Sequence, residues 1–257
     1  MKWILVIETD ENEYLYFERI ISRLGYRPYR AVTARQGYAY TVESLPDVLI
    51  CAEHLPDEDK YSFLNLINRD PQTANIPVLL ATTNRDFGFK MEARRSGFTD
   101  VIYRPLSIRK FCEKLEQCFS RSRRTHIRAP MCFPVEVLSK HGSRTLETFN
   151  FGEEGVYLQT NDPVTKKTHL NIQFKLPGFD TLLHLKGKVV HTSHSDSEEA
   201  PAGMGIQFTN LSGSLKAMLC IYMENFLAMT TPLVTTQGRL WCAEHGDMRP
   251  GGYQTGQ

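Results

Sequence analysis

Residues 121–130 read R-S-R-R-T-H-I-R-A-P, and this basic stretch divides the chain into two halves with different hydrophobic periods. Before it, apolar runs alternate with amphipathic helical patterns; after it, short alternating segments follow one another. Such a change predicts two domains, in agreement with a length of 257 residues. We place the domains at residues 1–120 and 121–230. Residues 231–257 are rich in Gly, Thr and Gln without a sustained period, and we expect a disordered tail there.

The overall charge is balanced, with 30 Lys and Arg against 29 Asp and Glu and a formal net charge of +1. This balance argues against a protein that coats nucleic acid. The apolar run after Met1 is too short for a signal peptide or a membrane span, so we expect a cytoplasmic protein without membrane insertion. The six cysteines have irregular spacing and are interpreted as small buried apolar residues rather than a disulfide framework.

The sequence C-A-E-H occurs twice, beginning at Cys51 and at Cys242. Neither copy has a second ligand pair at the spacing that zinc sites use, so we interpret the repeat as a coincidence. No metal is expected.

The first half alternates strand and helix patterns. Asp10 is placed to cap the first helix, and Gly25 follows that helix as a stop signal. The predicted strands are 4–7, 29–32, 48–51, 78–81 and 101–103, and the predicted helices are 11–24, 33–44, 61–68, 87–96 and 107–119. Five such repeats predict an α/β domain with a doubly wound, five-stranded parallel sheet. Ligand chemistry in these sheets lies at the carboxyl ends of the strands, which are marked here by Glu8, Thr9, Ala52, Thr82 and Arg104.

Four motifs follow one another in an order that resembles the receiver domain of two-component response regulators. They are V-I-E-T-D (6–10), P-D-V-L-I-C-A-E-H-L-P-D (46–57), L-L-A-T-T (79–83) and V-I-Y-R-P (101–105). The resemblance implies a flavodoxin-like fold. It also implies that these motifs carry the acidic pair, the phosphoacceptor strand, a hydroxyl position and a Lys-Pro pair.

Several residues of the phosphorylation site differ from that pattern. Ala52 stands at the nucleophile position, Thr9 replaces the second acidic residue, and Arg104 replaces the lysine, whereas Thr82 keeps its hydroxyl. A methyl group cannot attack phosphorus, and Thr9 removes a metal ligand. We expect Glu53 to be misdirected, because successive strand side chains point to opposite faces. The interpretation is a pseudoreceiver that works by protein contact, with pairing into a homodimer left open.

The second half predicts a small antiparallel β-barrel with a C-terminal helix. Turn signals separate strands at 133–138, 146–149, 155–160, 170–175, 184–191 and 204–209, and an apolar helix follows at 214–229. We expect most of the apolar face of this helix to cover the open end of the barrel.

The same region resembles the PilZ family of cyclic di-GMP receptors. The resemblance is carried by R-R-T-H-I-R-A-P (123–130), N-F-G-E-E-G-V-Y-L (150–158), L-K-G-K-V-V-H-T (185–192) and G-M-G-I-Q-F-T-N-L-S (203–212). It implies a cyclic di-GMP site.

In that site Arg124 and Arg128 would grip the phosphates or guanine edges, and Arg123 would add a contact or stack on a base. Asn150 would bond a guanine edge, and Gly155 would allow a tight turn. Gly152 stands where the family usually has serine, which removes one hydroxyl from the site.

Together the two resemblances imply a non-enzymatic bacterial signalling adaptor. It would bind cyclic di-GMP as a second messenger and relay it to an unknown protein partner in the control of motility, pili or exopolysaccharide. The alternative is a PilZ scaffold that no longer binds cyclic di-GMP. On that interpretation Gly152 has disabled the pocket and both domains serve only for docking. The structural alternatives for the motifs themselves are a solvated basic linker for the arginines and a simple hairpin turn for residues 150–155.

Overall fold

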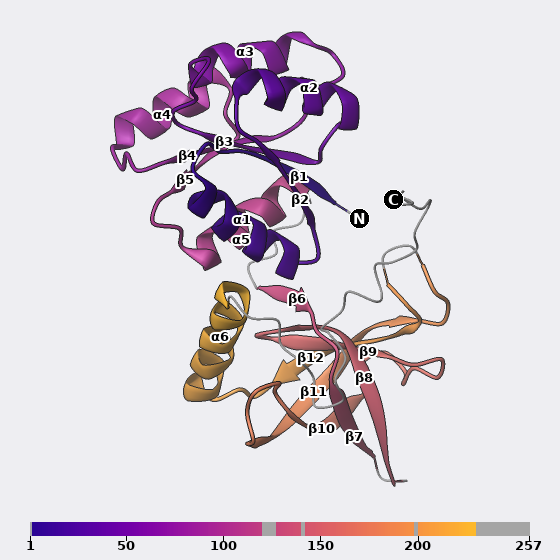
Figure 1. Cartoon of the computed structure of the whole chain (residues 1–257). Helices are drawn as coiled ribbons and strands as arrows, with labels where there is room; N and C mark the ends of the chain where they lie inside the picture. Colours follow the sequence, from indigo (N-terminus) through magenta and orange to yellow (C-terminus); the bar gives the residue numbers. More distant parts are fainter. Residues whose placement is uncertain (1, 120–126, 140–141, 198–199, 230–257) are drawn as a thin grey trace, which may run out of the picture. The chain divides into compact units, whose positions relative to one another are not determined.

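A computed structural model describes residues 2–119, 127–139, 142–197 and 200–229. The predicted tail, Arg123 and Arg124 lie outside the described residues. Packing divides the chain into two units, which are drawn in Figure 1. The first unit comprises Met1–Ile127 together with Cys220–Met229, and the second contains Arg128–Leu219.

The first unit contains the predicted five-stranded parallel sheet, in the order β2-β1-β3-β4-β5. The strands are β1 (Trp3–Ile7), β2 (Arg27–Ala31), β3 (Val48–Ala52), β4 (Val78–Thr82) and β5 (Asp100–Tyr103). The helices are α1 (Glu11–Arg23), α2 (Ala34–Ser44), α3 (Lys60–Arg69), α4 (Phe87–Ser96) and α5 (Ile108–Phe119). Figure 1 shows α1 and α5 on one face of the sheet and α2, α3 and α4 on the other. This is the doubly wound arrangement that the strand and helix periods predict.

Local signals fix where these elements begin and end. The Asp10 carboxylate accepts hydrogen bonds from the backbone N–H groups of Asn12 and Glu13, which confirms it as the cap of α1. Gly25 follows α1 with a φ of 83°, a left-handed conformation that favours glycine. All residues of β3 and β4 are buried, as expected for central strands covered by helices on both faces.

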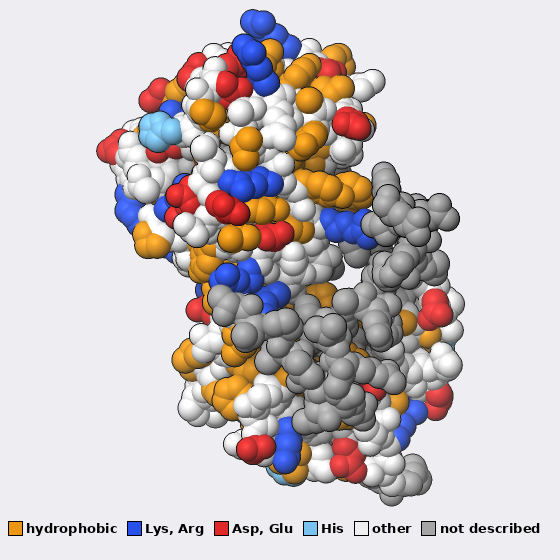
Figure 2. Space-filling view, viewed as in Figure 1, with side chains coloured by type: hydrophobic (Ala, Val, Ile, Leu, Met, Phe, Trp, Pro, Cys, Tyr) orange, Lys and Arg blue, Asp and Glu red, His pale blue; other side chains and the backbone are white. Residues whose placement is uncertain are grey.

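A buried carboxylate ties α4, β5 and α5 together. Asp100 is 8% exposed and forms ion pairs with Lys114, with Arg94 at 2.9 Å and with Lys90 at 3.9 Å. It also accepts a 2.8 Å hydrogen bond from the backbone N–H of Val101. On the face of the first unit that Figure 2 shows, acidic and basic side chains are interspersed.

Asp100 makes the stability of the first unit depend on pH. Burial alone would raise the pKa of Asp100, but the Lys114 ammonium, the Val101 N–H and Arg94 together hold it below its usual range. Its contribution to stability is therefore complete above the pKa of an unfolded aspartate, about 3.9, and is lost as pH falls through the lower folded value.

We expect Asp100→Asn to destabilise the protein by about 2 kcal/mol at pH 7, because three cations lose their buried counter-charge. The gap to wild type should narrow below pH 4. Thermal melts at a series of pH values measure this, with Asp180→Asn as a control at an exposed carboxyl. A gap that stays constant down to pH 2 would contradict the role given to Asp100.

The second unit contains an antiparallel barrel of six strands with one short strand added. The closed order is β8-β7-β10-β11-β12-β9 and back to β8, and β6 pairs with the far end of β8. The strands are β6 (Arg128–Pro130), β7 (Pro134–Ser139), β8 (Gly142–Gly152), β9 (Gly155–Gln159), β10 (His169–Lys175), β11 (Leu182–Ser193) and β12 (Gly203–Thr209). The predicted barrel is confirmed, but β6 and both ends of β8, residues 142–145 and 150–152, were not predicted.

The barrel core is aromatic at its centre. The ring of Phe151 lies 5.4 Å from Phe133, 5.7 Å from Phe174 and 5.9 Å from Phe208, measured between ring centroids. All four side chains are buried. They come from β8, β10, β12 and the segment before β7, so the cluster ties several strands of the barrel together.

The last helix, α6 (Gly213–Ala228), is divided between the two units. Its second half belongs to the first unit, where the Arg23 guanidinium donates to the Phe226 carbonyl and lies 5.0 Å from the Phe226 ring centroid. Arg109 also forms a 3.2 Å ion pair with Glu224. We expected the apolar face of α6 to cover the barrel, but its buried residues Tyr222 and Phe226 belong to the first unit.

The sequence did not indicate that the second half of α6 belongs to the first unit, because an apolar stripe does not specify its partner.

Among the described residues, no helix is both long and apolar enough to cross a bilayer.

Candidate functional sites

The structure brings the five predicted positions of the first unit to one edge of the parallel sheet. Glu8 and Thr9 follow β1, Ala52 ends β3, Thr82 ends β4 and Arg104 follows β5. Because all five strands run in the same direction, their carboxyl ends meet at this edge.

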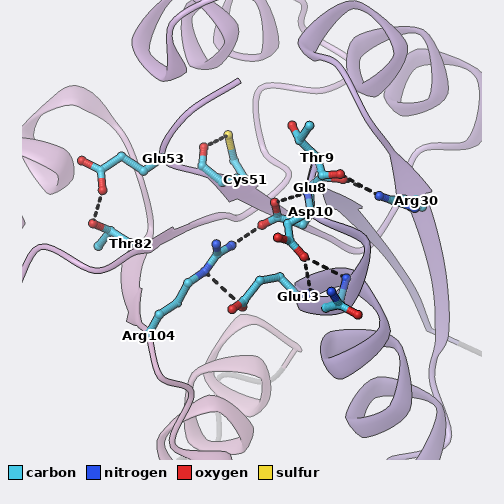
Figure 3. A network of polar contacts seen from close by, with 11 residues as sticks. Glu8, Thr9, Asp10, Glu13, Arg30, Cys51, Glu53, Thr82 and Arg104 are labelled. Carbon is cyan, nitrogen blue, oxygen red and sulfur yellow. Dashed lines mark hydrogen bonds and ion pairs between the residues drawn. The ribbon is translucent and has the colours of Figure 1, made fainter. Parts of the chain in front are cut away.

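Arg104 neutralises the acidic group at this edge. Its guanidinium pairs with the carboxylate of Glu8, which is 4% exposed, and its Nε lies 3.6 Å from Glu13 Oε2 (Figure 3). Glu8 also accepts a 2.9 Å hydrogen bond from the backbone N–H of Asp10, whose own carboxylate caps α1. Both carboxylates are therefore engaged by groups of the protein itself.

Glu53 forms a second, separate pair. Thr82 donates its hydroxyl hydrogen to the Glu53 carboxylate, and Lys60 lies 4.0 Å from the same group. Figure 3 shows this pair apart from Glu8 and Arg104. Strand alternation was the reason for expecting Glu53 to be misdirected, but β3 ends at Ala52 and Glu53 lies beyond it. The Glu53 carboxylate contacts the Thr82 hydroxyl at the end of β4.

Among the residues that the structure describes, no group of three or more His, Cys, Asp or Glu side chains is placed to hold a metal ion.

In the second unit, strand pairing gathers the predicted ligand residues that the structure describes. Arg128 pairs with Gly152, and Pro130 pairs with Asn150 in the β6–β8 register. Gly152 pairs in turn with Gly155 across the turn between β8 and β9. The exposed Arg128 guanidinium thus starts from a backbone position directly beside the N-F-G-E-E-G turn.

Gly155 is required for a reason that differs from the predicted one. Its φ is not in the left-handed region, so the turn itself does not demand glycine. A Cβ at Gly155 would lie 2.5 Å from the backbone oxygen of Ile206, and real side chains do not come so close to a carbonyl. Glycine is needed there because β9 passes close to β12.

Two acidic residues lie in the same turn. Glu153 is buried at 1% exposure, and Glu154 forms a 2.6 Å ion pair with Lys216 of α6. Lys216 was not among the predicted site residues. It lies 62 positions from Glu154, and no local pattern connects the two. The pair offsets one of the negative charges that an anionic ligand would meet at this turn.

A family model described as PilZ domain matches residues 122–223. The first half is similar to transcriptional regulators: RpaA of Synechocystis is 27% identical over 124 residues, which are 48% of this chain and 52% of RpaA. PhoB of Pseudomonas aeruginosa is 23% identical over 121 residues. This chain spans about half the length of each of these two relatives. PhoP of Salmonella typhi is 27% identical over 192 residues, which are 74% of this chain and 76% of PhoP.

Among solved structures, the receiver domain of the Francisella response regulator 1452 is 20% identical with a TM-score of 0.44, and covers 47% of this chain and 98% of that one. CheY4 of Vibrio cholerae is 19% identical with a TM-score of 0.44, and covers 46% of this chain and 99% of its own. The four motifs, the strand order and the sequence relatives all indicate a receiver domain in the first half of the chain. The chain therefore contains an N-terminal receiver domain followed by a PilZ domain at residues 122–223.

Proposed function

We propose that this protein is a cyclic di-GMP-binding signalling adaptor. The observation that carries the proposal is the pairing of Arg128 with Gly152, because the exposed Arg128 side chain starts from a backbone position beside the strand end that holds Asn150 and the turn after it. A guanidinium fork suits phosphate oxygens and the O6 and N7 acceptors of guanine. Arg123 and Arg124, upstream in the same motif, would complete the grip. The Lys216–Glu154 pair supports the proposal because it lowers the repulsion of an anionic ligand.

Titration calorimetry on the full-length protein tests this function, with GTP and cyclic di-AMP as controls. We expect selective binding of cyclic di-GMP in the micromolar range or tighter. Gly152→Ser should strengthen binding several-fold, because one neutral hydrogen bond contributes on the order of 1 kcal/mol.

A PilZ scaffold without a ligand is the second candidate, and Gly152 is the observation that favours it. If wild type does not bind and Gly152→Ser does, the missing hydroxyl is the cause and the scaffold becomes the working answer. If neither binds, the receptor function is wrong.

We also propose that the receiver domain does not accept a phosphoryl group, and works instead through contact with a protein partner. Ala52 offers a 4% exposed methyl group at the end of β3, and Glu8 is paired with Arg104. Receivers need a carboxylate nucleophile, further carboxylates for Mg²⁺ and a cation for the developing charge. Any output in motility, pili or exopolysaccharide rests on the family resemblance.

Incubation with acetyl phosphate and Mg²⁺, followed by a phosphate-affinity gel, tests whether the receiver domain accepts a phosphoryl group. We expect wild type to migrate as a single band, whereas a receiver with aspartate at the end of β3 gives a retarded band. A retarded wild-type band that disappears after acid or hydroxylamine treatment would show that another carboxylate has taken the place of the missing nucleophile.

A further inference from the structure

Strand register extends the proposed cyclic di-GMP site beyond the residues of its sequence motifs. Arg128 pairs with Gly152, Gly152 with Gly155, Gly155 with Gln207, and Gln207 with Lys188. These residues form one row across β6, β8, β9, β12 and β11. Cross-strand partners share a face of the sheet, so Lys188 lies in the same row as the arginine expected to hold a phosphate.

A second row runs beside the first. Asn150 pairs with Tyr157, Tyr157 with Gly205, and Gly205 with His191. Asn150 is the residue expected to bond a guanine edge, and we therefore call these four residues the guanine row. His191 stands at the end of this row opposite to Asn150. Neighbouring strands are about 4.8 Å apart, which places His191 roughly 14 Å from Asn150 across three strand spacings.

Both rows face away from the barrel core. The intervening positions Phe151, Val156, Ile206 and Val189 are at most 4% exposed and point inward. Because strand side chains alternate, the residues of the two rows point outward. Arg128, Gln207 and His191 are exposed and Lys188 is half-buried, so these polar groups line the outer wall.

Two register shifts place the ends of the guanine row. On β8 the shift lies between Thr148 and Asn150, and on β11 it lies between Val189 and His191. In a regular register without this shift, Val190 rather than His191 would stand opposite Gly205. A β-bulge re-aims the side chain that follows it, and here both shifts direct a hydrogen-bonding residue onto the same row.

Tyr157, in the middle of the guanine row, contacts the ring of His191 at the end of the row. The rings of Tyr157 and His191 have centroids 6.3 Å apart, and the Tyr157 hydroxyl donates a 2.8 Å hydrogen bond to the Pro201 carbonyl. A Cβ at Gly205 would lie 3.3 Å from the Cβ of His191, so glycine leaves room for the two rings to lean together. Tyr157 is thus anchored and supports the imidazole of His191.

We infer that Lys188 and His191 form the far side of the ligand site, with Lys188 contacting a phosphate and His191 contacting a guanine edge. The inference rests on the proposed cyclic di-GMP function. Cyclic di-GMP carries two phosphates and two guanines. The first row has Arg128 and Lys188 at its two ends for the phosphates, and the guanine row has Asn150 and His191 at its two ends for the guanines. An imidazole N–H donates to guanine O6, whereas adenine presents an amino donor at that position, so this contact favours guanine.

Titration of the full-length protein with cyclic di-GMP and cyclic di-AMP tests this inference. We expect Lys188→Ala to weaken cyclic di-GMP binding about tenfold, as for loss of one charge-assisted hydrogen bond. Lys186→Ala is the matched control, because Lys186 is also an outward-facing lysine of β11 but lies one row further from the site. It should bind within about twofold of wild type. Equal losses of cyclic di-GMP affinity in the two lysine variants would mean that Lys188 acts only through general electrostatic attraction, and would overturn its role as a phosphate contact.

His191→Ala is expected to weaken cyclic di-GMP about fivefold while hardly changing cyclic di-AMP, so that selectivity falls. His191→Gln retains an N–H donor and should recover most of the selectivity. If His191→Ala weakens the binding of both ligands equally, or of neither, His191 does not recognise a guanine edge. If wild type and Gly152→Ser both fail to bind, the proposed function fails together with this inference. If only Gly152→Ser binds, the same substitutions are compared in that background.

Discussion

Arg128→Ala is expected to reduce cyclic di-GMP affinity about 100-fold, while the melting temperature of the protein stays within about 2 °C of wild type. A charge-assisted, bidentate hydrogen bond to phosphate contributes about 1.5–3 kcal/mol, and each 1.4 kcal/mol is a factor of ten in affinity. The side chain is exposed on β6, so its removal leaves the barrel core untouched. Titration calorimetry and a thermal melt of the same sample measure both quantities.

Arg144→Ala is the matched control for this experiment. Arg144 lies on β8 and pairs with Asp162 at 3.1 Å, away from the turn at Asn150. The Arg144→Ala variant loses the same charge from the same unit, and its affinity for cyclic di-GMP should remain near that of wild type. Loss of folding in Arg128→Ala would instead identify Arg128 as a structural residue. Unchanged affinity would remove it from the ligand grip.

Arg104→Ala is expected to destabilise the receiver domain by about 3 kcal/mol. Glu8 is 4% exposed, and removal of its cation leaves a buried carboxylate without a counter-charge. Breaking one side of such a pair is far more costly than replacing both sides with uncharged groups. Chemical denaturation in a Trp241→Phe background measures the difference, because the remaining tryptophan, Trp3, stacks on Tyr29 in the first unit and reports on it by fluorescence.

Two further variants separate the charge from the packing. Arg104→Lys should lose about 1 kcal/mol, because one ammonium cannot bridge Glu8 and Glu13 as the guanidinium fork does. The double variant Glu8→Gln with Arg104→Met should recover most of the stability lost in Arg104→Ala. If the double variant is as unstable as Arg104→Ala, the cost lies in packing rather than in the unpaired charge.

The strands of the parallel sheet were predictable because continuous apolar runs, such as residues 48–51, are typical of strands buried on both faces. The Asp10 cap was predictable because it depends only on neighbouring residues. The ion pair of Arg104 with Glu8 joins residues 96 positions apart, and only the fold brings them together.

The barrel shows the same limit at the candidate ligand site. The motifs around Arg128 and Asn150 could be read from the sequence, but their pairing depends on β6, whose three residues carry no period. The register shifts beside Asn150 and His191 depend on partner strands, so the sequence of one strand alone does not reveal them. For this reason Lys188 and His191 were absent from the predicted site.

The division of α6 affects how the protein can be cut into fragments. Residues Cys220–Met229 supply Tyr222, Met223, Phe226 and Leu227 to the first unit, and all four side chains are buried. A fragment that ends at residue 119 has every strand of the parallel sheet but lacks this cover. Such a fragment would leave apolar surface open to water and would tend to self-associate. Dimers seen with an isolated receiver fragment would therefore say little about pairing of the whole protein.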